Sequence, residues 1–421
     1  MDFGKLFKGK KSIDDGGRIK VSPETFRRGV AITIPENGLS EKLVLTEKEK
    51  RPLIVKLGFD PTSKDLHLGH AVVLRKLREF QDAGHLVTVV IGDFTAQIGD
   101  PTVKNKTRPS LSKEEIRKNT DTYLDQLAII IDTKRVVVRF NSEWYKKMKM
   151  EDTLRLLARY NLGRMLARED FKKRLNDGAP IAMHEILYPL LQGYDSEVVR
   201  ADIEIGGTDQ LFNMQVGRAL QEEASLPAQA IVCMPILRGT DGTDKMSKSL
   251  GNYIALRDEP NDMYAKILSI PDGLIPEYID LATLFDENEK EMLKKSVADG
   301  TNPLEVKKTI AAHIVALYHS EKDARAAETF FYNHFQSSDP ERITYEERAR
   351  SSLGIQEKDA SLANVLVALG AAESKSAAKR LIEQGSVIIN GEKITDVGYC
   401  ISEVSFGTTI RAGKRGFYKI V

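Results

Sequence analysis

Short apolar runs alternate with amphipathic stretches over the first half of the chain, beginning near residue 51. Leu53–Phe59, Leu86–Gly92 and Arg135–Phe140 have the length and the β-branched content of buried strands. Between the first two, Ala71–Ala83 repeats apolar residues at helical spacing, and Gly84 ends that helix. Strands separated by helices predict βαβ units with a parallel sheet, in which ligands bind at the carboxyl ends of the strands.

The pattern changes twice further along the chain. A helical region with little strand character is followed by a polar segment typical of a linker. The last part predicts a small α+β unit with two short helices, the second capped by Ser374, and a hairpin with a type I′ turn at Asn390-Gly391. The predicted parts are an α/β domain at 1–254 (core 51–254, N-terminal extension 1–50), a helical domain at 255–335, a linker at 336–357 and the α+β domain at 358–421.

Composition and charge limit the classes of function. The chain is 41% hydrophobic and 29% charged, with no apolar run long enough to cross a bilayer and no N-terminal signal pattern. Its two cysteines have no CxxC spacing, which excludes a disulfide scaffold and a cysteine-based zinc site and fits a reducing cytoplasm. The net charge of +1 argues against nonspecific polyanion binding, although residues 361–421 carry eight basic and five acidic residues. We expect a cytoplasmic protein without a membrane segment and with a locally basic C-terminal part.

The segment DPTSKDLHLGH follows the first strand and opens the first helix. Its histidines allow three interpretations. A zinc site would need further ligands and the glutamate of an HExxH motif, whereas a polar cluster at the start of a helix needs nothing more. A phosphate site would use the N–H groups and the partial positive charge of the helix N-terminus. In that case Gly69 lets the ligand approach the backbone, and Thr62, His67 and His70 contact the nucleotide.

A second motif, DGTDKMSKSLGN, carries Lys245 and Lys248 in a glycine-containing loop. Alone, such a loop is typical of a solvated turn, but its lysines also suit the charge that grows on a pyrophosphate leaving group. HLGH and KMSKS together resemble the signature of class I aminoacyl-tRNA synthetases. KMSKS matches in full, and HLGH differs from the common HIGH by one apolar exchange. The resemblance implies a Rossmann-like catalytic domain that uses ATP, with Mg2+ carried by the nucleotide and no tightly bound metal.

The segment HEILYPLLQGYDSEVV places Tyr188, Gln192 and Asp195 on one helix face. A polar stripe facing solvent is the simpler interpretation of this spacing. The segment also resembles the tyrosine-pocket helix of the tyrosyl-tRNA synthetases, and DIEIGGTDQLFN resembles their GGSDQ-type segment. By this resemblance Asp195 accepts the hydrogen bond of the substrate phenol. Phenylalanine would leave that acceptor unpaired, an effect for which this enzyme family is a known example.

The same resemblance implies roles for further residues. Tyr188, Gln192 and Asp100 hold the substrate amino group, while Asp209 holds the ribose and Gln210 lines the pocket. The predicted set comprises the catalytic residues Thr62, His67, His70, Lys245 and Lys248; the ATP-binding residues Gly69, His70, Asp209, Lys248 and Ser249; and the tyrosine-binding residues Asp60, Asp100, Tyr188, Gln192, Asp195 and Gln210.

Lys56 departs from the pattern of the resembled family. Many tyrosyl enzymes carry a tyrosine two residues before the glycine of GFDPT, and here that position is Lys56. The chain in this respect resembles the second bacterial subfamily, and the phenol end of the pocket stays partly unassigned. Tryptophanyl-tRNA synthetases share the class and remain an alternative, against which the pocket helix and the C-terminal unit argue.

The C-terminal unit resembles the ribosomal-protein-S-four-like RNA-binding domain at the end of bacterial tyrosyl-tRNA synthetases. Its basic side chains suit contacts to RNA phosphates, while an ordinary α+β domain with surface lysines is the alternative. The residues expected to contact RNA are Lys375, Lys379, Arg380, Arg411, Lys414 and Arg415.

The resemblance covers nearly the whole chain from about residue 51. It predicts a tyrosine–tRNA ligase that joins tyrosine to ATP as tyrosyl-adenylate and then transfers the tyrosyl group to tRNA(Tyr). It also implies a homodimer. Two other classes stay open: a nucleotidyltransferase of the HxGH type, which would lack the tyrosine stripe and the C-terminal unit, and a synthetase-like RNA-binding protein without catalysis.

Overall fold

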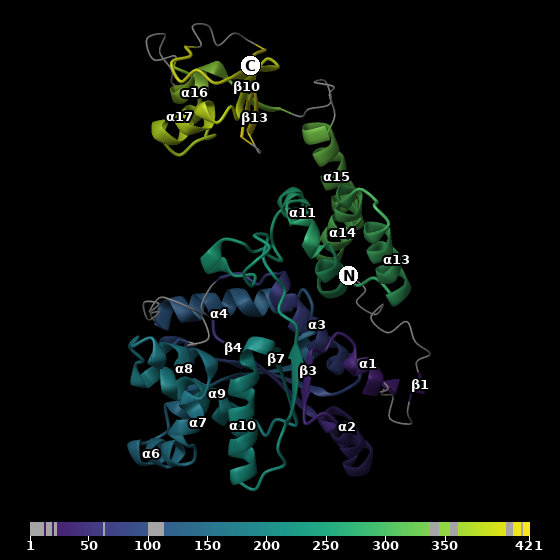
Figure 1. The fold of residues 1–421 in the computed structure, drawn as a ribbon, viewed down its shortest axis with the longest axis vertical. Coiled ribbons are helices and arrows are strands. Elements are labelled where there is room, and N and C mark those ends of the chain that lie inside the picture. The colour runs from purple at the N-terminus through teal and green to yellow at the C-terminus, as the bar shows by residue number, and fades with distance from the viewer. Residues whose placement is uncertain are drawn as a thin grey trace. The chain divides into compact units, whose positions relative to one another are not determined.

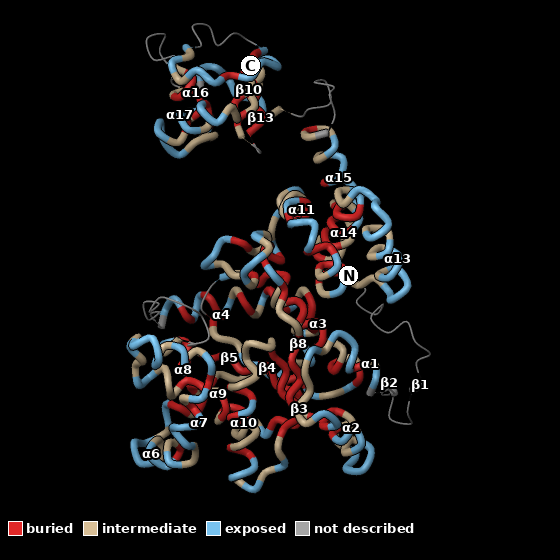
Figure 2. The backbone as a smooth tube through the Cα atoms, in the orientation of Figure 1, coloured by how far each residue is buried: buried red, intermediate tan, exposed pale blue. Residues whose placement is uncertain are grey.

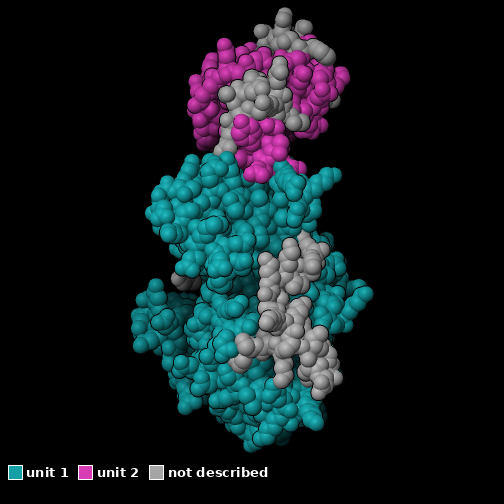
Figure 3. Space-filling model, turned by 90° about the vertical axis from the view of Figure 1, so that its right-hand side faces the viewer, with its two compact units in different colours: residues 1–325 teal, residues 326–421 magenta. Residues whose placement is uncertain are grey.

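The structure is a computed structural model that divides into two compact units, residues 1–325 and 326–421 (Figure 3). Each unit contains its own sheet and its own buried core. The described residues are 12–13, 19–20, 23–61, 64–99, 113–336, 345–353, 361–400, 407–413 and 416–421.

A six-stranded sheet forms the centre of the first unit (Figure 1). Its neighbours are parallel except for the first pair, which is antiparallel. The three strands expected from the sequence are confirmed to within one residue at their ends. Across the sheet the order is β3 (Ile32–Ile34), β8 (Ala230–Met234), β7 (Ile203–Gly207), β4 (Ile54–Phe59), β5 (Leu86–Ile91) and β6 (Val136–Phe140). A separate two-stranded sheet is formed by β1 (Ser12–Ile13) and β2 (Ile19–Lys20).

Helices cover both faces of this sheet. Helix α3 (Leu68–Asp82) connects β4 to β5, and α10 (Leu211–Glu223) connects β7 to β8. Such connections are right-handed, and these two steps run in opposite directions across the sheet, so α3 and α10 lie on opposite faces. Burial from both sides explains why β5 and β8 are apolar along almost their whole length, and Figure 2 shows buried strands in red at the centre of this unit.

The strand order sets the position of the site. The chain leaves β4 towards β5 and β6 and then returns to β7 on the other side of β4. The carboxyl ends of β4 and β7 therefore flank the point at which the direction across the sheet reverses. In open parallel sheets this switch point is where a ligand crevice forms.

Residues 23–50 complete the sheet of the first unit. They supply β3 as an edge strand beside β8, and Phe26 stacks on Phe80 of α3 with 4.3 Å between ring centroids. These residues were expected only to pack around the α/β domain, and the structure shows that they also contribute a strand to its sheet. The helices of the extension are α1 (Pro23–Arg27) and α2 (Gly38–Glu49).

The remaining helices of the first unit lie after β5. The chain after residue 254 forms the helices α11 to α15, and the boundary between the two units falls within α15. These helices are α4 (Lys113–Leu127), α5 (Ser142–Tyr145), α6 (Met150–Ala158), α7 (Leu162–Leu166), α8 (Glu169–Asn176), α9 (Met183–Val198), α11 (Pro260–Leu268), α12 (Ile275–Ala282), α13 (Glu287–Ala298), α14 (Pro303–Tyr318) and α15 (Glu321–Phe331). None of the described helices combines the length and the apolar character needed to span a bilayer.

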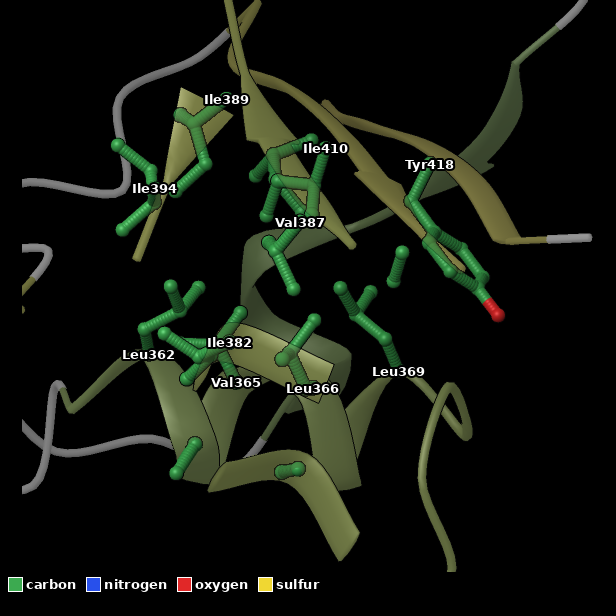
Figure 4. Packing of buried hydrophobic residues seen from close by; sticks show 14 of the residues in the cluster. Leu362, Val365, Leu366, Leu369, Ile382, Val387, Ile389, Ile394, Ile410 and Tyr418 are labelled. Carbon is green, nitrogen blue, oxygen red and sulfur yellow. The ribbon is translucent and has the colours of Figure 1, made fainter. Parts of the chain in front are cut away.

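The second unit packs two helices against a five-stranded sheet (Figure 4). Leu362, Val365, Leu366 and Leu369 from the first helical segment face Val387 and other residues of the sheet. Ser374 caps the second helix by accepting from Ala377 N, and Asn390 and Gly391 both have positive φ at the hairpin, as the sequence predicted. The elements are α16 (Leu362–Ala368) and α17 (Lys375–Glu383), with the strand order β11 (Glu392–Ile394), β10 (Val387–Ile389), β12 (Thr409–Ala412), β13 (Gly416–Ile420) and β9 (Glu346–Arg348).

The prediction of a linker at 336–357 is wrong for residues 345–353, which are part of the second unit. β9 pairs in parallel with β13, and Leu353 belongs to the buried core of the second unit. The polar sequence of β9 hid this strand because β9 lies at the edge of the sheet and all three of its residues are exposed. Residues 337–344 and 354–360 lie outside the described part of the chain.

Arg75 joins the sheet part of the first unit to its helical part. This buried side chain on α3 donates to Ala282 O at 2.8 Å and to Leu281 O at 3.3 Å, at the C-terminal end of α12. It also donates to the hydroxyl of Tyr318 at the end of α14. The guanidinium thus satisfies helix-end carbonyls that have no partner within the helix.

We expect Arg75→Met to lower the free energy of unfolding by about 3 kcal/mol, because it leaves buried carbonyls without donors. The urea midpoint measures this loss. Arg155→Met is the control, since the Arg155 side chain is 80% exposed and its substitution should change stability by less than about 0.5 kcal/mol. Equal effects of the two substitutions would contradict the anchoring role of Arg75.

Candidate functional site

Two motifs that are distant in sequence are joined by backbone hydrogen bonds at the switch point. Leu68 N donates to Ile254 O at 3.0 Å, and Leu256 N donates to Leu66 O at 2.9 Å. Leu66 and Leu68 lie at the HLGH segment after β4, whereas Ile254 and Leu256 follow the KMSKS loop. The structure therefore places both motifs of the sequence signature in one site. Thr62 and Asp100 lie outside the described residues.

The two histidine rings lie in close, tilted contact at the start of α3, with an interplanar angle of 48°. Their ring centroids lie 3.8 Å apart, and His67 N donates to Nδ1 of His70 at 3.2 Å. A Cβ on Gly69 would lie 3.1 Å from the His67 ring, so this glycine makes room for the imidazole. Among the described groups, Nδ1 of His67 is a buried polar atom without a hydrogen-bond partner.

Both imidazoles are neutral near neutral pH. Burial lowers the pKa of His70 to about 4, and the charge of Lys248 acts in the same direction. Burial also lowers the pKa of His67 well below its usual value, with further contributions from His70 and Lys248. Neutral rings can donate or accept hydrogen bonds at phosphate or ribose oxygens without adding charge. The described residues contain no group of three or more His, Cys, Asp or Glu placed to hold a metal ion.

The two lysines of the KMSKS loop contact carboxylates of the same crevice. Lys245 Nζ lies 2.7 Å from Asp209 Oδ2, just after β7, and Lys248 Nζ lies 3.3 Å from Asp65 Oδ2. Lys248 also lies over the ring of Tyr253, at 5.8 Å from its centroid. Burial lowers the pKa of Lys248, and Asp65 opposes that shift. These two carboxylates hold both ammonium groups at the switch point.

Asn252 shapes the KMSKS loop and was not among the predicted residues. Its Oδ1 accepts from Ser247 N at 2.7 Å, and its Nδ2 donates to Asp241 Oδ2 at 2.6 Å. The hydroxyls of Ser247 and Ser249 lie 2.9 Å apart. Asparagine after glycine in LGN is a common turn sequence, so its spacing alone did not distinguish this role.

Helix α9 carries the predicted tyrosine residues beside the crevice. Tyr188 donates to Asp60 Oδ2 at 2.9 Å, and Thr95 donates to Asp60 Oδ1 at 2.8 Å. A Cβ on Gly92, directly after β5, would lie 1.9 Å from Asp60 Oδ1, so a larger residue there would displace the Asp60 carboxylate. Asp60 and Tyr188 therefore form one fixed polar group directly after β4.

The Asp195 carboxylate is buried and held by three donors. Tyr145 OH and Trp144 Nε1 each donate to Oδ1 at 2.9 Å, and Asn141 Nδ2 lies 3.3 Å from Oδ2. Burial raises the pKa of Asp195 to about 6, although the positive charge of Lys56 and these donors oppose the rise. The three donors follow β6 in the segment NSEWY, which the sequence analysis did not single out; its position after a strand was the available signal.

Gln192 and Gln210 meet at a shared partner. Asn213 Nδ2 donates to Gln192 Oε1 at 2.9 Å and to Gln210 Oε1 at 3.2 Å. Asn213 Oδ1 in turn accepts from Arg168 at 3.3 Å. Because a guanidinium can only donate, this contact orients the Asn213 amide and turns the oxygens of both glutamines towards it. Neither Asn213 nor Arg168 was predicted.

Lys56 does not provide a phenol partner. Its side chain is fully buried, and its ammonium lies 2.8 Å from Glu204 Oε1 on the neighbouring strand β7. The two residues are register partners between β4 and β7. The residue that departs from the family pattern is therefore half of a buried ion pair.

The predicted RNA-binding residues separate into two groups. Lys375, Lys379 and Arg380 are exposed on α17. Arg411 is half-buried, with its guanidinium 5.6 Å and 5.2 Å from the ring centroids of Phe335 and Phe417. This contact gives Arg411 a packing role within the second unit. Lys414 and Arg415 lie outside the described residues.

Comparisons with known proteins agree with this geometry. Residues 48–336 match the family model described as tRNA synthetases class I (W and Y), and residues 361–403 match the S4 domain. The chain is 48% identical over 397 residues to the tyrosine–tRNA ligase of Thermotoga maritima, covering 94% of this chain and 96% of the relative. It is 46% identical to the tyrosine–tRNA ligase of Carboxydothermus hydrogenoformans, covering 96% of this chain and 98% of that one.

The chain belongs to the class I tRNA synthetases of the tryptophan and tyrosine group. The resemblance read from HLGH, KMSKS and the C-terminal unit is confirmed at the level of the family. Synthetases of the same fold include the Archaeoglobus fulgidus tyrosyl-tRNA synthetase complexed with L-tyrosine, with a TM-score of 0.56 at 23% identity over 72% of this chain and 97% of that chain. A C-terminally truncated mitochondrial tyrosyl-tRNA synthetase from Aspergillus nidulans has a TM-score of 0.58 at 21% identity over 73% of this chain and 92% of that chain.

The depressed pKa of His70 predicts a pH dependence of stability. In the unfolded chain this imidazole takes up a proton near its ordinary value of 6.5, but in the folded synthetase only near about 4. Unfolding therefore takes up a proton between these values, and stability falls as the pH drops through this window. We expect the urea midpoint to fall between about pH 7 and about pH 5, and to fall less in His70→Asn. An equal fall in both proteins would assign the effect to other groups.

Proposed function

We propose that this synthetase is a tyrosine–tRNA ligase that works with the residues of the switch-point crevice. The observation that supports this most directly is the pairing of the HLGH and KMSKS segments by backbone hydrogen bonds, next to a helix with Tyr188, Gln192 and Asp195. The relatives named as tyrosine–tRNA ligases cover nearly the whole chain and support the choice of tyrosine over tryptophan.

Tyrosine would bind along α9. Asp60 and Tyr188 supply a carboxylate and a hydroxyl for the substrate ammonium, together with Gln192 and, outside the described residues, Asp100. Asp195 would accept the phenol hydrogen at the far end of the helix. Gln210 lines the same pocket, and its orientation through Asn213 would match that of Gln192.

The first reaction step needs little acid–base chemistry. The carboxylate of tyrosine is already ionised; it attacks the α-phosphorus of ATP, and the bond to pyrophosphate breaks. Catalysis then rests on positioning and on stabilising the charge of the leaving group. His67, Lys245 and Lys248, with Thr62, would face the leaving phosphates, and Ser249 contributes a hydroxyl. Gly69, His70 and Asp209 would seat the adenosine.

ATP would replace the present partners of the two lysines. Lys245 and Lys248 contact Asp209 and Asp65, respectively. A nucleotide triphosphate is the stronger competitor because it carries several charges, and Asp209 would then be free for the ribose. Mg2+ would arrive with ATP, bound by phosphates and water.

The second step transfers tyrosine to the 3′-terminal adenosine of tRNA(Tyr). The S4 domain and the exposed Lys375, Lys379 and Arg380 of α17 support contacts with folded RNA phosphates. A cytoplasmic location is part of the same proposal, supported by the two cysteines, which are free in the structure.

We propose a homodimer through the helices next to the tyrosine pocket. Large hydrophobic side chains are exposed on α6 to α9, and these helices share one hydrophobic core around Tyr145 and Phe171. A second copy would remove this apolar surface from water. The side chains in question are Met150, Leu154, Leu162, Leu175 and Met183.

Tyrosine-dependent ATP–pyrophosphate exchange tests the catalytic proposal. Lys248→Ala should slow exchange by about a hundredfold, because it removes an ammonium group that stabilises the charge developing on the leaving pyrophosphate in the transition state. The KM for tyrosine should change little. Lys266→Ala is the matched control, since Lys266 also lies over the Tyr253 ring and pairs with a carboxylate, yet comes from α11. No exchange with tyrosine in the unmodified protein would refute the activity itself.

Charge reversal on α17 tests the RNA-binding proposal. Lys375→Glu, Lys379→Glu and Arg380→Glu together should raise the KM for tRNA(Tyr) about tenfold or more, since phosphate contacts are lost, and leave the exchange reaction unchanged. Lys48→Glu, on an exposed position of α2, serves as a control. If the triple variant charges tRNA with an unaltered KM, this face of α17 does not bind RNA.

A further inference from the structure

A fully buried polar network lies beneath the tyrosine pocket, between β4, β7 and α9. Lys56 Nζ contacts Glu204 Oε1 at 2.8 Å, Ser196 Oγ at 2.7 Å and the carbonyl oxygen of Gln192 at 3.2 Å. Ser196 donates to the other oxygen of Glu204 at 2.9 Å, and Gln229 donates there as well. All three hydrogens of the ammonium therefore have an acceptor, and both oxygens of the carboxylate have a donor.

Stability alone is a weak reason for such a network. A buried ion pair usually stabilises a fold no better than apolar side chains of the same volume, because both charges lose their hydration. The neighbouring positions on β4, Val55 and Leu57, are apolar and buried. The central strand thus carries a charge at one position where a hydrophobic residue would fit the pattern.

The network holds the turn of α9 that carries the pocket residues. Two of the three Lys56 contacts go to this turn, one to the Gln192 carbonyl and one to the Ser196 hydroxyl. Asp195 lies between these two residues in sequence, and its side chain points to the donors after β6. Lys56 and Glu204 thereby tie α9 to the centre of the sheet directly behind Asp195.

Lys56 also supplies the positive charge that acts most on Asp195. Among the described residues, the groups that hydrogen-bond to this carboxylate are neutral: Tyr145 and Trp144 from α5, and Asn141 after β6. Burial without a cation would favour the protonated acid, which is a donor and no longer a pure acceptor for a phenol hydrogen.

We propose that Lys56, paired with Glu204, is a positioning residue for tyrosine selectivity: it fixes the Gln192–Ser196 turn and keeps Asp195 an ionised acceptor for the substrate phenol. This role rests on the proposed function of Asp195 in the pocket. In many members of this family a tyrosine at the position of Lys56 is a direct partner of the phenol. Here the residue at that position would act from behind the pocket, through Asp195.

The double variant Lys56→Met with Glu204→Gln tests this role, because it removes both charges and keeps an amide oxygen for Ser196 and Gln229. We expect the kcat/KM ratio of tyrosine over phenylalanine in ATP–pyrophosphate exchange to fall about tenfold, mainly through KM for tyrosine. The acidic limb of the pH profile of kcat/KM for tyrosine should move to higher pH, because the charge of Lys56 acts on Asp195, whereas the charge of Glu204, which is removed with it, is not among the main influences on this carboxylate.

Lys307→Met with Asp272→Asn is the matched control. Lys307 is a buried lysine that pairs with Asp272 at 2.6 Å in the helical part of the unit. Its loss should lower the melting temperature and leave both the selectivity ratio and the pH profile unchanged. If the Lys56–Glu204 variant behaves in the same way as this control, the network is only structural and the proposal is overturned.

Ser196→Ala keeps the test decisive if the double variant does not fold. It removes the hydrogen bond between Lys56 and the Ser196 hydroxyl of α9 without changing any charge. The KM for tyrosine should therefore rise about threefold, while the acidic limb of the pH profile stays at the same pH. An unchanged KM would overturn the positioning role.

Asp195→Asn in the same assay distinguishes a failure of the proposed phenol contact from a failure of the role of Lys56. If this substitution leaves the selectivity ratio unchanged, Asp195 does not bind the substrate phenol. If Asp195→Asn lowers the ratio but the Lys56–Glu204 variant does not, only the role of Lys56 fails.

Discussion

The order of the strands in the six-stranded sheet is the constraint on which the site depends. Because the chain reverses its direction across the sheet between β4 and β7, the ends of these neighbours open into one crevice. Asp60 and the histidine pair leave β4 there, and Asp209 and Gln210 leave β7. Both strands are held by burial on two faces, so the most apolar part of the unit determines where its polar groups converge.

The KMSKS loop reaches this crevice through the short backbone pairing of residues 66–68 with 254–256. The pairing sets neutral imidazoles on one side and two ammonium groups on the other. This division suits a triphosphate. The ammonium groups can stabilise the negative charge that develops on the leaving phosphates, and the neutral imidazoles can add hydrogen bonds without repelling the lysines. The low pKa of both histidines is a consequence of the same proximity and burial, so the electrostatics and the backbone pairing arise together.

The sequence was sufficient to predict the parallel strands, the capped helix and hairpin of the second unit, and the family. Each of these predictions rests on local periodicity or on a contiguous motif. The sequence was not sufficient for contacts made across distant segments. Trp144 and Tyr145 reach Asp195 from more than 45 residues away, and Asn213 connects two glutamines through its own amide. β9 was missed for a related reason, since an exposed edge strand carries no apolar alternation.

Lys56 shows how the meaning of one residue depends on such distant partners. In the sequence it is only a lysine where a tyrosine is often found, and its partner Glu204 follows 148 residues later. The strand register brings the two together, and their pairing removes the cost of an isolated buried charge. Because Lys56 is bound to Glu204, the proposed phenol site consists of Asp195 and the donors that surround it. In this proposal, selectivity at this end of the pocket depends on the ionisation and placement of one carboxylate, and both would be controlled from the sheet behind it.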